Sequence, residues 1–175
     1  MPHGEPEGPL ALVRTRGAPT TLAAVSFDIF LVALKNGVAT EIDRDALVGA
    51  MGPSLTRVGI ADRVETPDGG SAEIYLPDEE KPDSCMFALH GDLSPSLADT
   101  IMAAATAANC AIYWPADPPL MAYPDPAMLP HMPPGPDAPN PVYCASGSEL
   151  RLLIHSGLDA WKKYRDQVVG RRSKS

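Results

Sequence analysis

Hydrophobic residues occupy every second position in the first strongly patterned stretch of the chain, residues 24–34 (AVSFDIFLVAL). Phe27, Ile29 and Leu31 fall on one side of this alternation, and the stretch is rich in β-branched and aromatic residues. That pattern predicts a strand. Asn36-Gly37 follows directly and is typical of a turn.

Downstream, apolar stripes alternate with turn signals and predict six further short elements. They are a helix from Asp43 to Gly52-Pro53, a hairpin of runs 56–65 and 71–76 around Pro67–Gly70, a strand at 85–90, an alanine-rich helix at 95–109 capped by Ser94, a strand at 111–114 and, at 142–145, either a short strand or an anchored return.

The last element is a helix predicted from Ser148 to about Val169, with Ser148 as its cap. Its apolar positions recur at helical spacing: Leu150, Leu153, Ile154, Leu158, Trp161, Tyr164 and Val168. The resulting order is β-α-β-β-β-α-β, then a proline-rich excursion and this long helix. We therefore predict an α+β fold, with an antiparallel or mixed sheet of about five strands and helices on one face.

The proline-rich excursion spans 115–141 and holds eleven of the chain's twenty prolines. Because each proline fixes φ and removes a backbone donor, we expect neither a regular helix nor a central strand there. Apolar side chains are interspersed with the prolines, so the segment is not a plain linker. It either lies on its own domain, which we favour, or offers a polyproline II ligand to a partner.

Length and composition indicate one domain, residues 21–170, with an apolar fraction of 45% that suits a globular core. Residues 1–20 are rich in Pro and Gly and are expected to form a flexible extension, and 171–175 a frayed tail.

Charge is unevenly distributed along the chain. Residues 1–161 carry a net charge of −13, whereas residues 162–175 carry +5. An acidic body argues against nucleic acid as a partner and favours a protein partner, for which a basic surface would be complementary. The basic end also suits the C-terminal end of a helix dipole.

The three cysteines, Cys85, Cys110 and Cys144, have no metal-ligand spacing, so we expect buried, reduced thiols in a cytoplasmic protein. No metal site or cofactor is predicted. The chain has no run of about 18 apolar residues of the kind that crosses a membrane, and we expect a soluble protein.

Catalytic chemistry has one weak candidate, His90 with Asp92, at the end of a predicted strand and before a helix. A histidine oriented by a carboxylate could act as a general base, and Tyr113 and Trp114 could complete a small-molecule pocket. The simpler interpretation is a turn with a half-buried histidine. Two local residues do not supply the geometry of catalysis.

Protein binding has two candidate groups of residues. Tyr123, Met128 and Met132 stand in the proline-rich excursion, and Trp161 and Tyr164 on the last helix. The latter pair could also form a homodimer face, although such stripes more often belong to a core.

The residues SFDIFLVALKNGVATEIDRDAL resemble the opening of small bacterial proteins of uncharacterised function. With the later hairpin, strand, alanine-rich helix and strand, the resemblance covers about residues 25–116 and includes no catalytic signature. The resemblance implies that residues 1–24 are an extension to the core, of the kind that an alternative start site would produce. Some such acidic proteins look like immunity proteins. The leading hypothesis is therefore a non-enzymatic, partner-binding module of the immunity-like kind, and the alternative is a small-molecule enzyme or binder.

Overall fold

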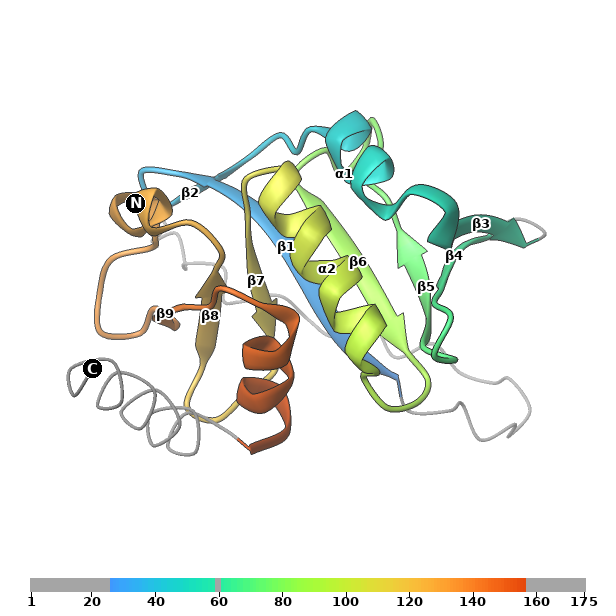
Figure 1. The fold of residues 1–175 in the computed structure, drawn as a ribbon. Helices are drawn as coiled ribbons and strands as arrows, with labels where there is room; N and C mark the ends of the chain where they lie inside the picture. Colours follow the sequence, from blue (N-terminus) through green and yellow to red (C-terminus); the bar gives the residue numbers. More distant parts are fainter. Residues whose placement is uncertain (1–25, 59–60, 157–175) are drawn as a thin grey trace, which may run out of the picture.

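The computed structural model describes residues 26–58 and 61–156, which build one nine-stranded sheet with helices (Figure 1). The strand order is β3-β4-β5-β6-β1-β7-β8-β9, and β2 pairs with β1 outside this path. All pairs are antiparallel except β8 with β9. The strands are β1 (Phe27–Lys35), β2 (Val38–Thr40), β3 (Leu55–Val58), β4 (Ala61–Glu65), β5 (Ser71–Tyr75), β6 (Ser84–Leu89), β7 (Cys110–Trp114), β8 (Leu120–Tyr123) and β9 (Asn140–Tyr143).

The predicted α+β class with a mixed sheet is confirmed, but the expected count of about five strands and the expected order β-α-β-β-β-α-β are wrong. The predicted run 56–65 divides into β3 and β4, which pair with each other. The short strands β2 and β8 were not predicted from the sequence. β2 has three residues and exists because β1 is long enough to pair with it as well as with β6 and β7.

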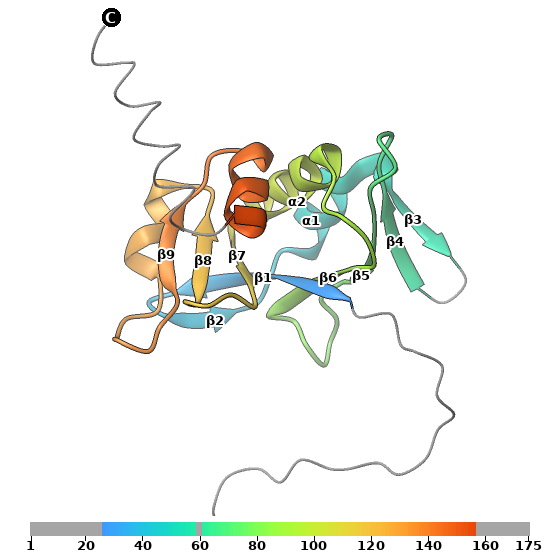
Figure 2. The ribbon, with the colours of Figure 1, turned by 90° about the horizontal axis from the view of Figure 1, so that it is seen from below.

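The regular helices are α1 (Arg44–Met51) and α2 (Pro95–Ala107), and residues 147–156 are also helical. Figure 2 shows all three on the same side of the sheet. The main core lies between them and that face. Ile29 and Leu31 of β1, Phe87 of β6 and Ile101 of α2 are fully buried there.

Helix α2 begins as the sequence predicts. The Ser94 hydroxyl accepts a hydrogen bond from the Leu97 amide at 3.2 Å, and Pro95 occupies the first turn. The buried alanines Ala98, Ala104 and Ala105 have small side chains that suit close packing against the sheet and the neighbouring helices.

The β4–β5 hairpin is tied to the start of α2 by the carboxylate of Asp68. Its Oδ1 accepts hydrogen bonds from the hydroxyls of Thr66 (2.6 Å) and Ser94 (2.8 Å), and its Oδ2 accepts one from the amide of Ser96 (2.8 Å). Gly70 is at this junction, where a Cβ would collide with the Ser94 and Thr66 side chains. The hairpin therefore closes tightly against the helix.

The proline-rich excursion contains β8, a strand with neighbours on both sides, so the expectation of no central strand there is wrong. Leu120–Tyr123 is a proline-free window between Pro119 and Pro124, and its amides remain available for pairing. After β8, the 3₁₀ helix η2 (Pro126–His131) lies on the sheet face opposite α1 and α2. Its Met128 packs with Met121 and Tyr123 of β8 in a second apolar cluster.

The C-terminal helix starts two residues earlier than predicted, because Ser146 caps it instead of Ser148. The Ser146 hydroxyl accepts a hydrogen bond from the Glu149 amide at 3.2 Å, and the Glu149 carboxylate accepts one from the Ala145 amide at 2.7 Å. Leu150 and Leu153 enter the core. The predicted continuation to Val169 lies outside the described residues.

Candidate functional site

A cleft of about 1030 Å3 opens at one end of the sheet, between β4–β5, the segment before α1 and the loop after β5. The loop and the start of α1 are joined by a hydrogen bond from the Ile42 amide to the Pro82 carbonyl at 2.8 Å. The loop itself is shaped by Asp78, whose Oδ1 accepts hydrogen bonds from the amides of Glu80 and Lys81. These contacts give the cleft a defined wall.

The cleft is acidic around an apolar floor. Acidic residues from four segments of the chain line it: Glu41, Asp62, Glu73, Asp78 and Glu79. The Glu73 carboxylate, however, pairs with Arg63 on the face of the β4–β5 hairpin opposite Asp62 and Ile74. Two arginines also line it, Arg44 and Arg57, and Arg57 pairs with Asp62 at 3.2 Å. Buried Ile74 and half-buried Leu76 form part of the floor. The other four carboxylates against two guanidinium groups leave this surface net negative.

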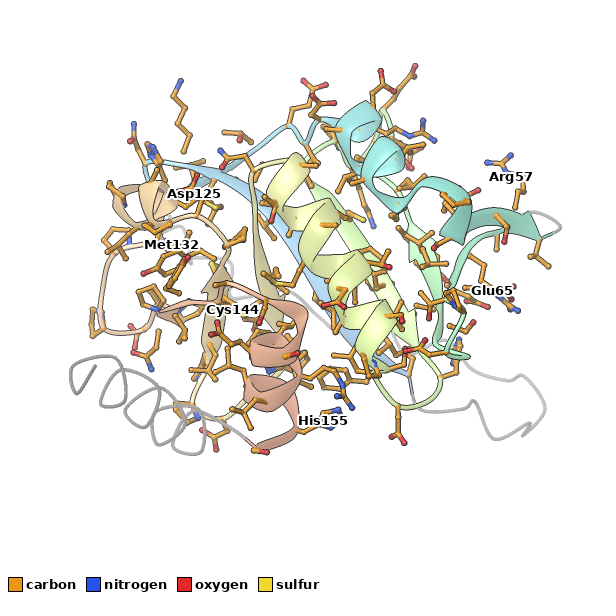
Figure 3. All side chains as sticks on the ribbon, in the orientation of Figure 1. Arg57, Glu65, Asp125, Met132, Cys144 and His155 are labelled. Carbon is orange, nitrogen blue, oxygen red and sulfur yellow. The ribbon has the colours of Figure 1, made fainter. Side chains whose placement is uncertain are left out.

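A second hollow of about 490 Å3 continues from the cleft around the start of α1, where Asp43 and Asp45 join Glu41 and Arg44. Asp43 is the N-cap of α1, since its carboxylate accepts a hydrogen bond from the Ala46 amide at 2.9 Å. In Figure 3 the labelled Arg57 marks the end of the molecule at which the cleft lies, with Asp125 and Met132 at the opposite end. The acidic surface and the proline-rich segment are therefore far apart.

The structure does not bring the four predicted small-molecule pocket residues to one place. His90 and Asp92 are exposed beyond the end of β6, whereas Trp114 is buried in the main core. Tyr113, the next residue along β7, points to the opposite sheet face and contacts Phe30. None of the four lines the acidic cleft.

His90 does have a carboxylate neighbour, but it is Glu73 instead of the predicted Asp92. The His90 Nε2 lies 3.8 Å from Glu73 Oε2, and Arg63 is 3.9 Å from the same carboxylate group. This exposed group forms an ion-pair network on the surface of β4, β5 and β6. The Tyr75 hydroxyl also donates a hydrogen bond to Glu73 Oε2 at 3.5 Å.

The predicted partner-binding residues fall into two groups. Tyr123, Met128 and Met132 are buried in the second apolar cluster, which supports the interpretation that the proline-rich segment packs on its own domain. Trp161 and Tyr164 lie outside the described residues.

The cysteines are free and buried, as predicted. Burial raises the pKa of Cys85, Cys110 and Cys144 to about 12, so each stays a protonated thiol at neutral pH. Within 26–58 and 61–156, no three metal-ligating side chains gather in a possible ion site, and no helix is long and apolar enough to span a membrane.

Acidic residues are dense at 78–83 in the sequence, but no pattern in it indicated Glu41, Arg44, Arg57, Asp62 and Glu73 as their neighbours. The sequence indicated only an excess of acidic residues. It could not indicate that these positions share a cleft, because pairing between distant strands brings them together. Comparison with known proteins finds no match to this chain among family models, curated proteins or solved structures.

Proposed function

We propose that this protein is a non-enzymatic module that binds a protein partner with a basic surface, and that the acidic cleft is its binding site. The observation that carries the proposal is the convergence of four carboxylates from three chain segments, Glu41, Asp62 and Asp78–Glu79, on one concave surface. A local excess of charge along the sequence would leave these groups dispersed. Their convergence creates a surface that favours positive charge.

The chemistry of the walls suits lysine and arginine side chains. Such residues bury their aliphatic stems on apolar surface while the charged group stays near carboxylates or water. Leu76 and Pro77 offer the apolar part, and Glu41 and Glu79 offer exposed carboxylates. A lysine or arginine side chain bound in the cleft would contact both the apolar surface and the carboxylates.

The size of the cleft favours a macromolecule over a small ligand. Small-molecule pockets are usually about 300–1,000 Å3 and enclose most of the ligand. The present cleft is at the upper limit, at about 1030 Å3, and continues into the hollow beside α1. A loop or helix end of a protein would fill such a surface.

The charge of the whole described body supports the same partner class. Its eighteen acidic and six basic side chains give a net charge of −12. Long-range attraction to a basic protein would accelerate association, and the cleft would supply the specific contacts.

The test is affinity capture from the native host with the full-length chain as bait, at low and high salt. A variant with Glu41→Gln and Glu79→Gln removes two charges from the cleft. The matched control, Asp92→Asn with Asp137→Asn, removes two exposed charges elsewhere. We expect the wild type and the control to retain a basic protein that the cleft variant loses.

Purified partner then gives the affinity by calorimetry. The cleft variant should bind at least about tenfold more weakly than the control, since close charge pairs at interfaces are worth over 1 kcal/mol each. Equal weakening in both variants would show that net charge alone acts. Failure of the wild type to retain any partner at low salt would contradict the proposal.

A further inference from the structure

The acidic cleft already holds one guanidinium group, which belongs to the chain itself. Arg57 of β3 lies directly opposite Asp62 of β4, and its Nε donates a hydrogen bond to Asp62 Oδ1 at 3.2 Å. Both residues line the cleft. An internal cation therefore occupies part of the surface on which a partner's cation is expected to bind.

Asp62 is the least exposed of the four carboxylates that face the cleft. Its side chain is 19% exposed, whereas Glu41, Asp78 and Glu79 are exposed. Its neighbour across the strand pair on β5 is the buried Ile74. Partial burial beside an apolar residue strengthens the attraction between a carboxylate and a cation, because less water screens it. Of the four carboxylates, Asp62 is therefore the best placed to anchor a cation.

The contact that Arg57 makes with Asp62 is incomplete. Only the Nε of its guanidinium donates, and within residues 26–58 and 61–156 the Oδ2 of Asp62 accepts no hydrogen bond. Arginine binds a carboxylate most strongly through two parallel N–H···O bonds. The Arg57 side chain is also 68% exposed, and ion pairs of exposed side chains are weak. A better-oriented guanidinium could therefore displace Arg57 at little cost.

We propose that Asp62 is the anchor for an arginine of the protein partner, whose guanidinium displaces Arg57 and binds both carboxylate oxygens. This inference rests on the proposed function of the cleft, and it names the side chain that the cleft takes. Arg57 then acts as an internal competitor that keeps Asp62 paired until the partner binds. A guanidinium is favoured over an ammonium because its planar fork matches the two oxygens of one carboxylate.

Arg44 supplies a matched control for Arg57. It also lines the cleft and is exposed, but among the described residues it forms no ion pair with a carboxylate. Arg57→Gln and Arg44→Gln each remove one positive charge from the same surface. Only Arg57→Gln also frees Asp62, so the difference between the two variants isolates the competition from the change in net charge.

The experiment is calorimetry of the full-length protein with an acetylated, amidated penta-arginine peptide, at about 0.15 M NaCl. We expect Arg57→Gln to bind the peptide about fivefold more tightly than Arg44→Gln, since only the first variant frees Asp62. When each is combined with the isosteric Asp62→Asn, the two variants should bind equally. Equal affinities with Asp62 intact, or weaker binding by Arg57→Gln, would overturn the proposal. The second result would show that Arg57 itself contacts the ligand.

A penta-lysine peptide of the same charge tests whether the anchor takes a guanidinium. We expect Arg57→Gln to prefer penta-arginine over penta-lysine by about threefold, because only arginine forms the bidentate contact. The preference should disappear when Asp62→Asn is added. A preference that is absent, or that persists without the Asp62 carboxylate, would overturn the assignment of a guanidinium to this residue.

The cleft variant of the capture experiment and its matched control distinguish failure of this inference from failure of the proposed function. Weaker binding of penta-arginine by the cleft variant than by the control, with equal affinities for Arg57→Gln and Arg44→Gln, would refute only the roles of Arg57 and Asp62. Equal binding by the cleft variant and the control would show that the peptide does not use the cleft. That result would overturn both the proposed function and this inference.

Discussion

At the scale of single residues, Asp68 joins two elements that are far apart in the sequence. Hydrogen bonds from Thr66 and from the amide of Ser96 hold the pKa of its carboxyl well below the usual range, although the group is exposed. Such bonds stabilise the charged form. The folded protein is therefore more stable when Asp68 is ionised.

We predict that Asp68→Asn lowers the free energy of unfolding at pH 7, and that the difference from wild type decreases in acid. Because the folded-state pKa is depressed, the contribution is complete above the ordinary aspartate pKa of about 3.9 and is lost as the pH falls through the folded value. Urea unfolding at pH 7 and about pH 3 measures this. The exposed Asp92→Asn is the control, and an equal loss at both pH values would contradict the prediction.

At the scale of elements, the proline-rich segment is held by its ends and in its middle. The Asn140 amide donates to the Pro119 carbonyl at 2.9 Å, and the Gly37 amide donates to the His131 carbonyl at 3.0 Å. Met128 is 3% exposed, whereas its neighbour Leu129 is 48% exposed. These two neighbouring residues can therefore show by mutation whether the proline-rich segment packs on the protein's own sheet or binds a partner.

We predict that Met128→Ala destabilises the protein by about 2–5 kcal/mol, the usual cost of removing a buried methionine side chain. Leu129→Ala should change the stability by less than about 0.5 kcal/mol, as surface substitutions do. Chemical denaturation of both variants gives the comparison. Equal, small effects would support the alternative in which the segment serves a partner.

At the scale of the whole molecule, the net charge of −12 over the described residues dominates the electrostatics. Like charges repel one another and destabilise the compact state, and salt screens them beyond about 8 Å at physiological ionic strength. Asp78, Glu79 and Glu80 concentrate this repulsion in one loop.

We therefore predict that raising NaCl from about 10 to about 200 mM raises the Tm by a few degrees. The variant with Glu79→Lys and Glu80→Lys should show a smaller rise, because it removes part of the repulsion. Calorimetry of both proteins over this range measures the effect. A Tm that is constant or falls with salt would contradict it.

Local patterns were sufficient for several elements. Ser94-Pro95 marked the start of α2, and the alternation of Phe27, Ile29 and Leu31 identified β1. Local patterns did not predict β8, because its four proline-free residues are too few to stand out as a strand among the surrounding prolines. The candidate site was still less accessible, since the sequence separation between Glu41 and Glu79 hides their shared cleft.

The sequence by itself determined the α+β class, the acidity of the body, the buried thiols and the caps that begin α1 and α2. These properties depend on composition or on residues within one turn of each other. Only the tertiary structure decided which carboxylates converge on one surface. Strand order and register arise from pairing between distant segments, whose energies depend on cross-strand packing and burial together.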